Sequence, residues 1–213
     1  MKIPSRAIVL AVVLASGSGA CSTAQSDEET GKASFSASRV CGGFANRSAV
    51  AQALRAATAV DRFSDARSKP EQTLQSLTNA DGKVSGAELL GSPYCRLQDG
   101  DSGDEVLTIS FRQALTVDKA DPEDERHFTF FQTGLSALAS EHTAGIYFNC
   151  RMNDSRKEII IHGDLELEKS ARISNEKLTN ANMQLLNAAA SKVSVELGCR
   201  GSSITSSMPT EGS

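Results

Sequence analysis

The sequence predicts an α+β fold, in which an antiparallel sheet of about five strands packs against N-terminal helices and a long C-terminal helix. Three observations indicate this fold. Apolar residues recur every three or four positions near both ends of the chain. In the middle of the chain they alternate with polar residues instead. Four cysteines flank these segments, where disulfides would staple helices to the sheet.

The first 20 residues have the layout of a secretory signal peptide. Lys2 and Arg6 form a positive start, residues 7–15 are an unbroken apolar run, and residues 16–20 are all small. The apolar run is far shorter than the roughly 20 residues that span a bilayer as a helix. We therefore expect cleavage after Ala20 and export of a mature chain without a transmembrane helix.

Cys21 is the expected lipidation site. Ser18 and Ala20 suit ordinary signal peptidase, but the same stretch resembles a bacterial lipobox, in which small residues precede a lipid-bearing cysteine. The chain has five cysteines, and exported proteins pair theirs. Removing Cys21 leaves four. We therefore expect acyl chains such as palmitate on Cys21 at the outer face of the cytoplasmic membrane, with simple secretion as the alternative.

Residues 21–39 are small, polar and acidic, and predict a flexible tether.

Three helices are expected in the rest of the chain. Residues 46–59 carry a narrow apolar face, with Asn46 as a plausible N-cap. Ser68-Lys-Pro-Glu71 resembles a capping box with an early proline and predicts a second, short helix. Residues 175–197 have the strongest helical pattern, and Gly198 follows at the C-terminal end.

Five strands are expected between these helices, at residues 94–98, 105–115, 127–131, 145–152 and 158–168. The last of them alternates most cleanly. Ile159 and Ile161 face the core, while His162 and Asp164 face solvent.

We assign residues 40–200 to a single globular domain, because that length suits one core. Residues 201–213 are small and polar, and predict a disordered tail.

The four domain cysteines predict two disulfides. Four cysteines allow three connectivities, which sequence cannot distinguish. We prefer Cys41–Cys95 and Cys150–Cys199, because each pair would join a helix end to a strand. A metal site is the alternative for these four residues, but they include no short Cys-x-x-Cys pair.

Two acidic stretches are weak candidates for a metal ion. Residues 79–88 resemble the later part of an EF-hand calcium loop, but the first ligand position falls on Leu77, which has no side-chain oxygen. The second stretch is a Gly-rich loop that equally fits a solvated hairpin turn. The candidate ligands are Asn79, Asp81 and Glu88 in the first stretch, and Asp99, Asp101 and Asp104 in the second.

Catalytic signatures are weak. The three histidines, His127, His142 and His162, match no short zinc motif, and no Gly-x-Ser-x-Gly marks a nucleophile. Asp164 follows His162 by two positions, which places both on one face of a strand without making them a catalytic pair. The segment from His127 to Phe131 is rich in Phe and could line an apolar pocket, although core packing suits these rings as well.

The composition limits the range of partners. The formal net charge is −4 and the charges are dispersed, so no basic surface for nucleic acid is expected. The chain has no Trp and two Tyr, which disfavours a sugar-stacking platform. No cofactor motif is found, and no cofactor is expected. The expected partners are the membrane, through the lipid on Cys21, and an unidentified protein or small molecule.

Several motifs together resemble the small exported lipoproteins of actinomycete (Streptomyces-type) bacteria. They are the lipobox-like end, the acidic tether, Val40-Cys-Gly-Gly-Phe44 before an Ala-rich helix, Phe63, and Pro93-Tyr-Cys-Arg-Leu97. The resemblance covers about the first half of the mature chain. That family has no assigned activity, so it implies only the lipid on Cys21. We expect a non-enzymatic cell-surface binding module. The alternatives are an exported hydrolase that uses a histidine and a calcium-stabilised surface module.

Overall fold

The computed structural model describes residues 34–65, 67–80, 92–118, 127–152 and 158–212. Three α-helices lie in this part of the chain: α1 (Ser48–Thr58), α2 (Pro70–Asn79) and α3 (Asn175–Glu196). Each helix agrees with its prediction to within a few residues. Gly198 has the positive φ of 66° that commonly ends a helix, directly after the C-cap of α3.

Within the described residues, eight antiparallel strands form one sheet in the order β1-β2-β3-β4-β8-β7-β6-β5. The four long strands in the centre are β3 (Ser92–Asp99), β4 (Glu105–Ala114), β8 (Glu158–Leu167) and β7 (Thr143–Arg151). The edges are β1 (Phe35–Ser36) and β2 (Arg62–Ser64) on one side, and β6 (Ser136–Ala139) and β5 (Thr129–Phe130) on the other. The prediction of about five strands is wrong, because a strand of two to four residues is too short to show alternation.

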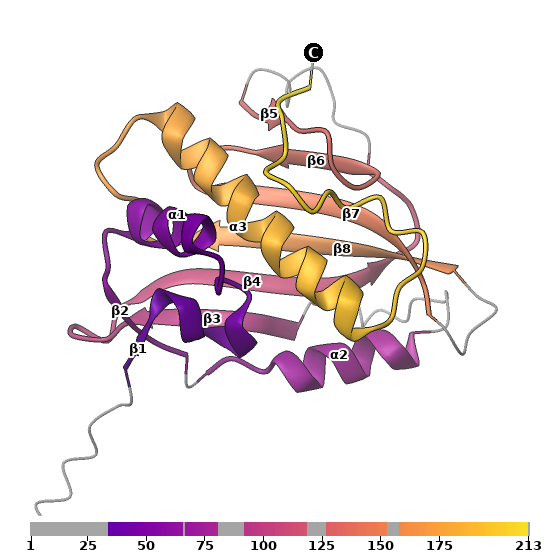
Figure 1. The fold of residues 1–213 in the computed structure, drawn as a ribbon, viewed down its shortest axis with the longest axis horizontal. Helices are drawn as coiled ribbons and strands as arrows, with labels where there is room; N and C mark the ends of the chain where they lie inside the picture. Colours follow the sequence, from indigo (N-terminus) through magenta and orange to yellow (C-terminus); the bar gives the residue numbers. More distant parts are fainter. Residues whose placement is uncertain (1–33, 66, 81–91, 119–126, 153–157, 213) are drawn as a thin grey trace, which may run out of the picture. The chain divides into compact units, whose positions relative to one another are not determined.

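The helices cover one face of the sheet. Helix α3 crosses β6, β7 and β8, α1 lies beside it, and α2 packs against β3 and β4 (Figure 1). The sheet residues facing these helices are almost all apolar and buried, among them Ile109, Phe111, Ile146, Phe148 and Ile161. Because side chains alternate along a strand, the residues between them form a second face, called the outer face below.

Two predicted helix caps differ in the structure. The N-cap of α1 is Arg47 rather than Asn46, and its side chain makes no capping hydrogen bond. Ser68 does not cap α2, which has Lys69 as its N-cap. The Ser68 hydroxyl instead accepts a hydrogen bond of 2.8 Å from the backbone N–H of Arg96 in β3. This serine therefore ties the start of α2 to the sheet.

Two disulfides join Cys41 to Cys95 and Cys150 to Cys199. These are the pairs preferred from the sequence. They fix the segment before α1 to β3, and the residue after α3 to the end of β7. Disulfides are typical of proteins that fold in an oxidising compartment. Within the described residues, no helix combines the length and the hydropathy needed to cross a bilayer.

Both ends of the folded unit extend further than predicted. Ala37 is fully buried and Phe35 packs against the core, so part of the expected tether, residues 21–39, belongs to the fold. At the other end, residues 202–212 are an extended segment rather than a disordered tail. This segment, called the C-terminal segment below, pairs with the edge of the sheet, where the N–H of Gln132 donates to the carbonyl of Thr210 over 2.8 Å. The predicted signal peptide (1–20), Cys21, Asp81 and Glu88 lie outside the described residues.

Candidate functional site: a cavity on the outer face of the sheet

The strand register brings polar side chains together on the outer face. His162 of β8 stands opposite Arg112 of β4 on one side and Tyr147 of β7 on the other. Two residues along β8, Asp164 stands opposite Gly145. Since facing residues in adjacent strands have neighbouring side chains, this register places three ionisable groups and one aromatic alcohol within a few ångströms.

Tyr147 and His162 form a stacked pair. Their ring centroids are 4.0 Å apart and their planes differ by 9°. The Tyr147 hydroxyl donates a hydrogen bond of 2.8 Å to Oδ2 of Asp118, in the segment that follows β4. Burial and then this hydrogen bond raise the pKa of Tyr147 to about 12, which keeps the phenol protonated. The pair is a fixed aromatic surface, because each ring holds the other in place and Asp118 fixes the tyrosine.

His162 is buried, contrary to the prediction that it faces solvent. It is 8% exposed, and its Nε2 lies 3.2 Å from Oδ1 of Asp164. Burial, followed by the positive charge of Arg112, lowers the pKa of His162 to about 4. At neutral pH the ring is therefore uncharged. Its Nδ1 has no hydrogen-bond partner among the described residues.

Asp164 has the opposite shift. Burial raises its pKa to about 6, Arg112 opposes this change and Glu166 adds to it. The guanidinium of Arg112 is 3.9 Å from Oδ2, at the limit of an ion pair. The carboxylate is therefore incompletely compensated. Its side chain is 42% exposed, so solvent screens part of the unfavourable burial.

A cavity of about 280 Å³ opens above this cluster. We call it the outer-face cavity. Its walls come from three strands, β6, β7 and β8, and from the segments on either side of residues 119–126. The described lining residues are Asp118, Phe128, Ser136, Leu138, Thr143, Ala144, Gly145, Tyr147, His162, Asp164, Leu165 and Glu166. Gly145 helps to keep it open, because a Cβ there would stand 3.5 Å from Nε2 of His162 and 3.9 Å from a methyl group of Leu138.

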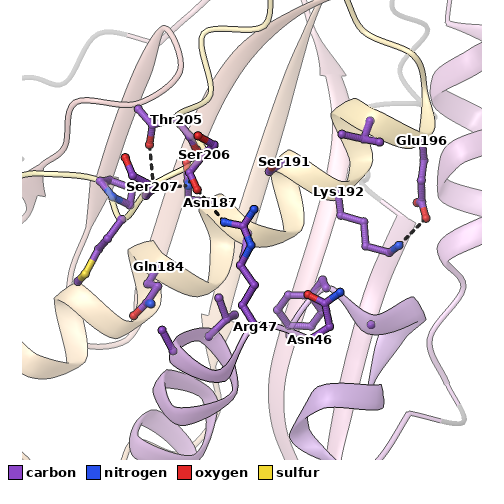
Figure 2. Close-up of a pocket in the computed structure, with 18 residues that line it drawn as sticks. Asn46, Arg47, Gln184, Asn187, Ser191, Lys192, Glu196, Thr205, Ser206 and Ser207 are labelled. Atoms are coloured by element: carbon purple, nitrogen blue, oxygen red, sulfur yellow. Dashed lines mark hydrogen bonds and ion pairs between the residues drawn. The ribbon is translucent and has the colours of Figure 1, made fainter.

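A second, larger hollow of about 450 Å³ lies between α1, α3 and the C-terminal segment. Figure 2 shows Arg47 reaching from the start of α1 to this segment, where its Nη1 donates to the carbonyl of Ser206 over 2.7 Å. Asn187 of α3 donates to the carbonyl of Thr205 over 3.0 Å and accepts from the Thr133 hydroxyl over 2.7 Å. Lys192 pairs with Glu196 at 2.8 Å.

These contacts assign the second hollow a structural role. Its cations and its buried amide already have partners. Arg47 at the start of α1 and Asn187 of α3 both donate to carbonyls of the C-terminal segment, and Lys192 pairs with Glu196 within α3. The outer-face cavity differs. Among the described residues, Asp118 accepts one hydrogen bond, Asp164 has a long ion pair with Arg112, and the buried Nδ1 of His162 has no hydrogen-bond partner. We therefore take the outer-face cavity as the candidate functional site.

The other residues singled out in the sequence do not join this site. His127 is exposed, and His142 is exposed in the turn before β7, with its Nε2 3.4 Å from Glu141. Asp99, Asp101 and Asp104 form the β3–β4 hairpin turn, in which Oδ1 of Asp99 accepts from the N–H of Asp101 over 2.9 Å. Asn79 is the exposed last residue of α2. Among the described residues, no three His, Cys, Asp or Glu side chains are placed to hold a metal ion.

Sequence reasoning missed Asp118, Arg112 and Tyr147 as site residues. Tyr147 and Arg112 could have been found from the register, because both lie on polar-facing positions of strands that flank β8. Phe128 was considered as a pocket residue and does line the cavity, whereas Phe131 is buried in the core. Nothing in the sequence indicates that Asp118 reaches this face, because it follows β4 by four residues in an irregular segment.

Comparisons with protein-family models, with curated proteins and with solved structures find no match to this chain. The chemistry of the outer-face cavity is therefore the basis on which function is derived. It offers an uncharged aromatic floor, an apolar wall from Phe128 and Leu138, and carboxylates at the rim.

Proposed function

We propose that this protein is an exported binding module, held at the outer surface of the cytoplasmic membrane by a lipid on Cys21, that binds a small molecule in the outer-face cavity. The observation that carries the proposal is this cavity of about 280 Å³, with its rigid Tyr147–His162 floor and convergent polar groups. Polar groups that converge on a hollow with an apolar wall are typical of ligand sites, and the volume lies near the lower end of their usual range.

The cysteines support the proposed attachment to the membrane. Four of the five pair with one another, which leaves Cys21 without a cysteine partner in the chain. It stands directly after the small residues at which cleavage is expected. A bacterial anchor with two or more acyl chains would give stable attachment, whereas one chain is marginal.

The geometry favours binding over hydrolysis by His162. A general base works best when its pKa is near the working pH, and burial lowers that of His162 to about 4. Its Nε2 is directed to Asp164, and Nδ1 has no hydroxyl within hydrogen-bond distance among the described residues. These features suit His162 to be an uncharged part of the cavity wall rather than a general base.

The binding proposal is tested on the mature domain with a panel of small cationic, neutral and anionic organic molecules, followed by two-dimensional NMR. We expect members of the panel to shift the resonances of Gly145 and Tyr147. Gly145→Val should abolish these shifts while retaining the fold, because its methyl groups would occupy the cavity. If no molecule in a broad panel shifts cavity residues, the proposal fails.

The hydrolase alternative is tested with a panel of chromogenic esters. We expect no turnover that depends on His162. Hydrolysis by the wild-type protein that is lost in His162→Asn, but retained in His142→Asn, would overturn a purely binding role.

The lipid attachment to Cys21 is tested by measuring the intact mass and the detergent phase partition of the mature protein. We expect an N-terminus at Cys21 that carries acyl mass, and loss of that mass in Cys21→Ala. A mature N-terminus without acyl mass would contradict the anchor and leave simple secretion.

A further inference from the structure

The charged residues among the described lining of the outer-face cavity are all acidic. They are Asp118, from the segment after β4, and Asp164 and Glu166 of β8. Within the part of the chain that the structure describes, no lysine or arginine lines the cavity. The nearest described cation is Arg112, whose side chain is 26% exposed and lies at the outer limit of contact with Asp164. The described lining of the cavity is therefore acidic, and Arg112 compensates its negative charge only in part.

His162 does not supply the missing positive charge. Burial lowers its pKa to about 4, which keeps the ring uncharged at physiological pH. The residue is 8% exposed, and its Nδ1 is itself buried, with no hydrogen-bond partner among the described residues. Tyr147 donates its only hydroxyl proton to Asp118, so its oxygen also has acceptor capacity to spare. Carboxylates and a phenol oxygen that can still accept a hydrogen bond suit a ligand that is positively charged and rich in N–H donors.

The rest of the lining distinguishes an organic cation from a metal ion. Phe128 and Leu138 form an apolar wall, which a metal ion could not use. The carboxylates are also not placed to coordinate one ion together with a third ligand among the described residues. An aromatic ring beside carboxylates attracts an ammonium group through its π face as well as through charge.

We propose that the outer-face cavity binds the ammonium end of a small organic amine, with the hydrocarbon part of the ligand against Phe128 and Leu138. This inference rests on the proposed binding function and assigns its ligand class. Glu166 and Asp118 at the rim pair with the ammonium group, and the Tyr147–His162 stack forms the floor beneath it.

The test compares three molecules of one shape and different charge: benzylamine, benzyl alcohol and benzoate. Each is titrated into the mature domain and followed by NMR shifts of the cavity residues. We expect benzylamine to bind at least tenfold more tightly than the other two, with an affinity that falls as salt is added. Equal or tighter binding of benzyl alcohol or benzoate at the same residues would overturn the amine assignment and leave the binding function standing.

Variants that remove one carboxylate at a time test whether the preference for benzylamine arises in the outer-face cavity. Glu166→Gln should weaken benzylamine binding several-fold and leave benzyl alcohol unchanged, because it removes charge and almost no volume. Glu168→Gln is the matched control, since Glu168 is exposed two residues further along the chain and does not line the cavity. Equal weakening by both variants would show a general charge effect and contradict the site. If benzylamine shifts the resonances of no cavity residue, the amine assignment is also wrong. The binding function is tested separately, with the broader panel and Gly145→Val.

Discussion

Nε2 of His162 lies 3.2 Å from Oδ1 of Asp164, and burial moves the pKa values of these two partners in opposite directions, to about 4 for the imidazole and about 6 for the carboxyl. Both shifts favour the uncharged form. The two groups therefore have opposing effects on the pH dependence of stability.

The His162 contribution should make the protein sensitive to acid. The unfolded chain protonates this residue near pH 6.5, whereas the folded protein does so only near pH 4, so stability is lost as pH falls between these values. The full shift corresponds to about 3 kcal/mol at roughly 1.4 kcal/mol per pKa unit. Urea unfolding of His162→Phe from pH 7 to pH 4 should lack this loss. His142→Gln is the control, because that ring is exposed, and it should behave as wild type.

Asp164 should partly offset that loss. Its folded pKa lies above the ordinary aspartate pKa of 3.8, so it stabilises the protein at low pH and this contribution is lost as pH rises through about 6. Asp164→Asn should therefore lose stability more steeply than wild type between pH 6 and pH 4. In His162→Phe, where only the carboxyl remains, stability should change little or rise slightly over the same range. An identical slope in all three proteins would contradict the assigned pKa shifts.

Gly163 should tolerate no side chain, although it lies in the middle of a long strand. A Cβ at this position would come within 2.6 Å of Cε1 of Phe111, which stacks edge-on against Tyr94 at 5.4 Å in the core. Gly163→Ala should cost about 1–3 kcal/mol of unfolding free energy, measured by chemical denaturation, because close-packed rings must shift. Gly145→Ala on the neighbouring strand is the matched control. Its Cβ meets only ordinary contacts, so it should change stability by less than about 0.5 kcal/mol.

The regular elements of the fold could be predicted because their signals are local. The helix of residues 175–197 and the strand of residues 158–168 each agree with the structure to within one residue at either end. The alternation in that strand also placed His162 on the outer face correctly. It could not show that this face is covered, because Asp118 and Phe128, which line the same cavity, come from distant segments.

The C-terminal segment was not predictable for a related reason. Its small polar residues cannot bury a large apolar area, so composition indicates disorder. The structure holds it through hydrogen bonds of its backbone: Asn187 and Arg47 donate to its carbonyls, and the N–H of Thr205 donates to the Thr133 hydroxyl. Such bonds depend on partners far away in the sequence and leave no pattern within the segment itself.

The disulfide between Cys150 and Cys199 should contribute strongly to stability. It closes a loop across a sequence separation of 49 residues, which the chain-entropy relation converts to about 4 kcal/mol. The double variant Cys150→Ala/Cys199→Ala should lower the free energy of unfolding by an amount of that order, measured by denaturant titration. The single variant Cys21→Ala in the mature soluble chain is the control and should unfold as wild type, because neither disulfide uses Cys21.

Asn187 should be the residue on which the C-terminal segment depends most. It is 5% exposed, and its amide joins the Thr133 hydroxyl to the carbonyl of Thr205. Asn187→Ala leaves buried polar groups without partners, at a cost of about 1–3 kcal/mol. Hydrogen exchange of residues 202–212 should accelerate far more than exchange in β8. Gln184→Ala, which removes an amide one turn earlier on α3 that makes no hydrogen bond to another described residue, should leave exchange unchanged. Equal acceleration in both variants would mean that the segment is held by general packing rather than by this amide.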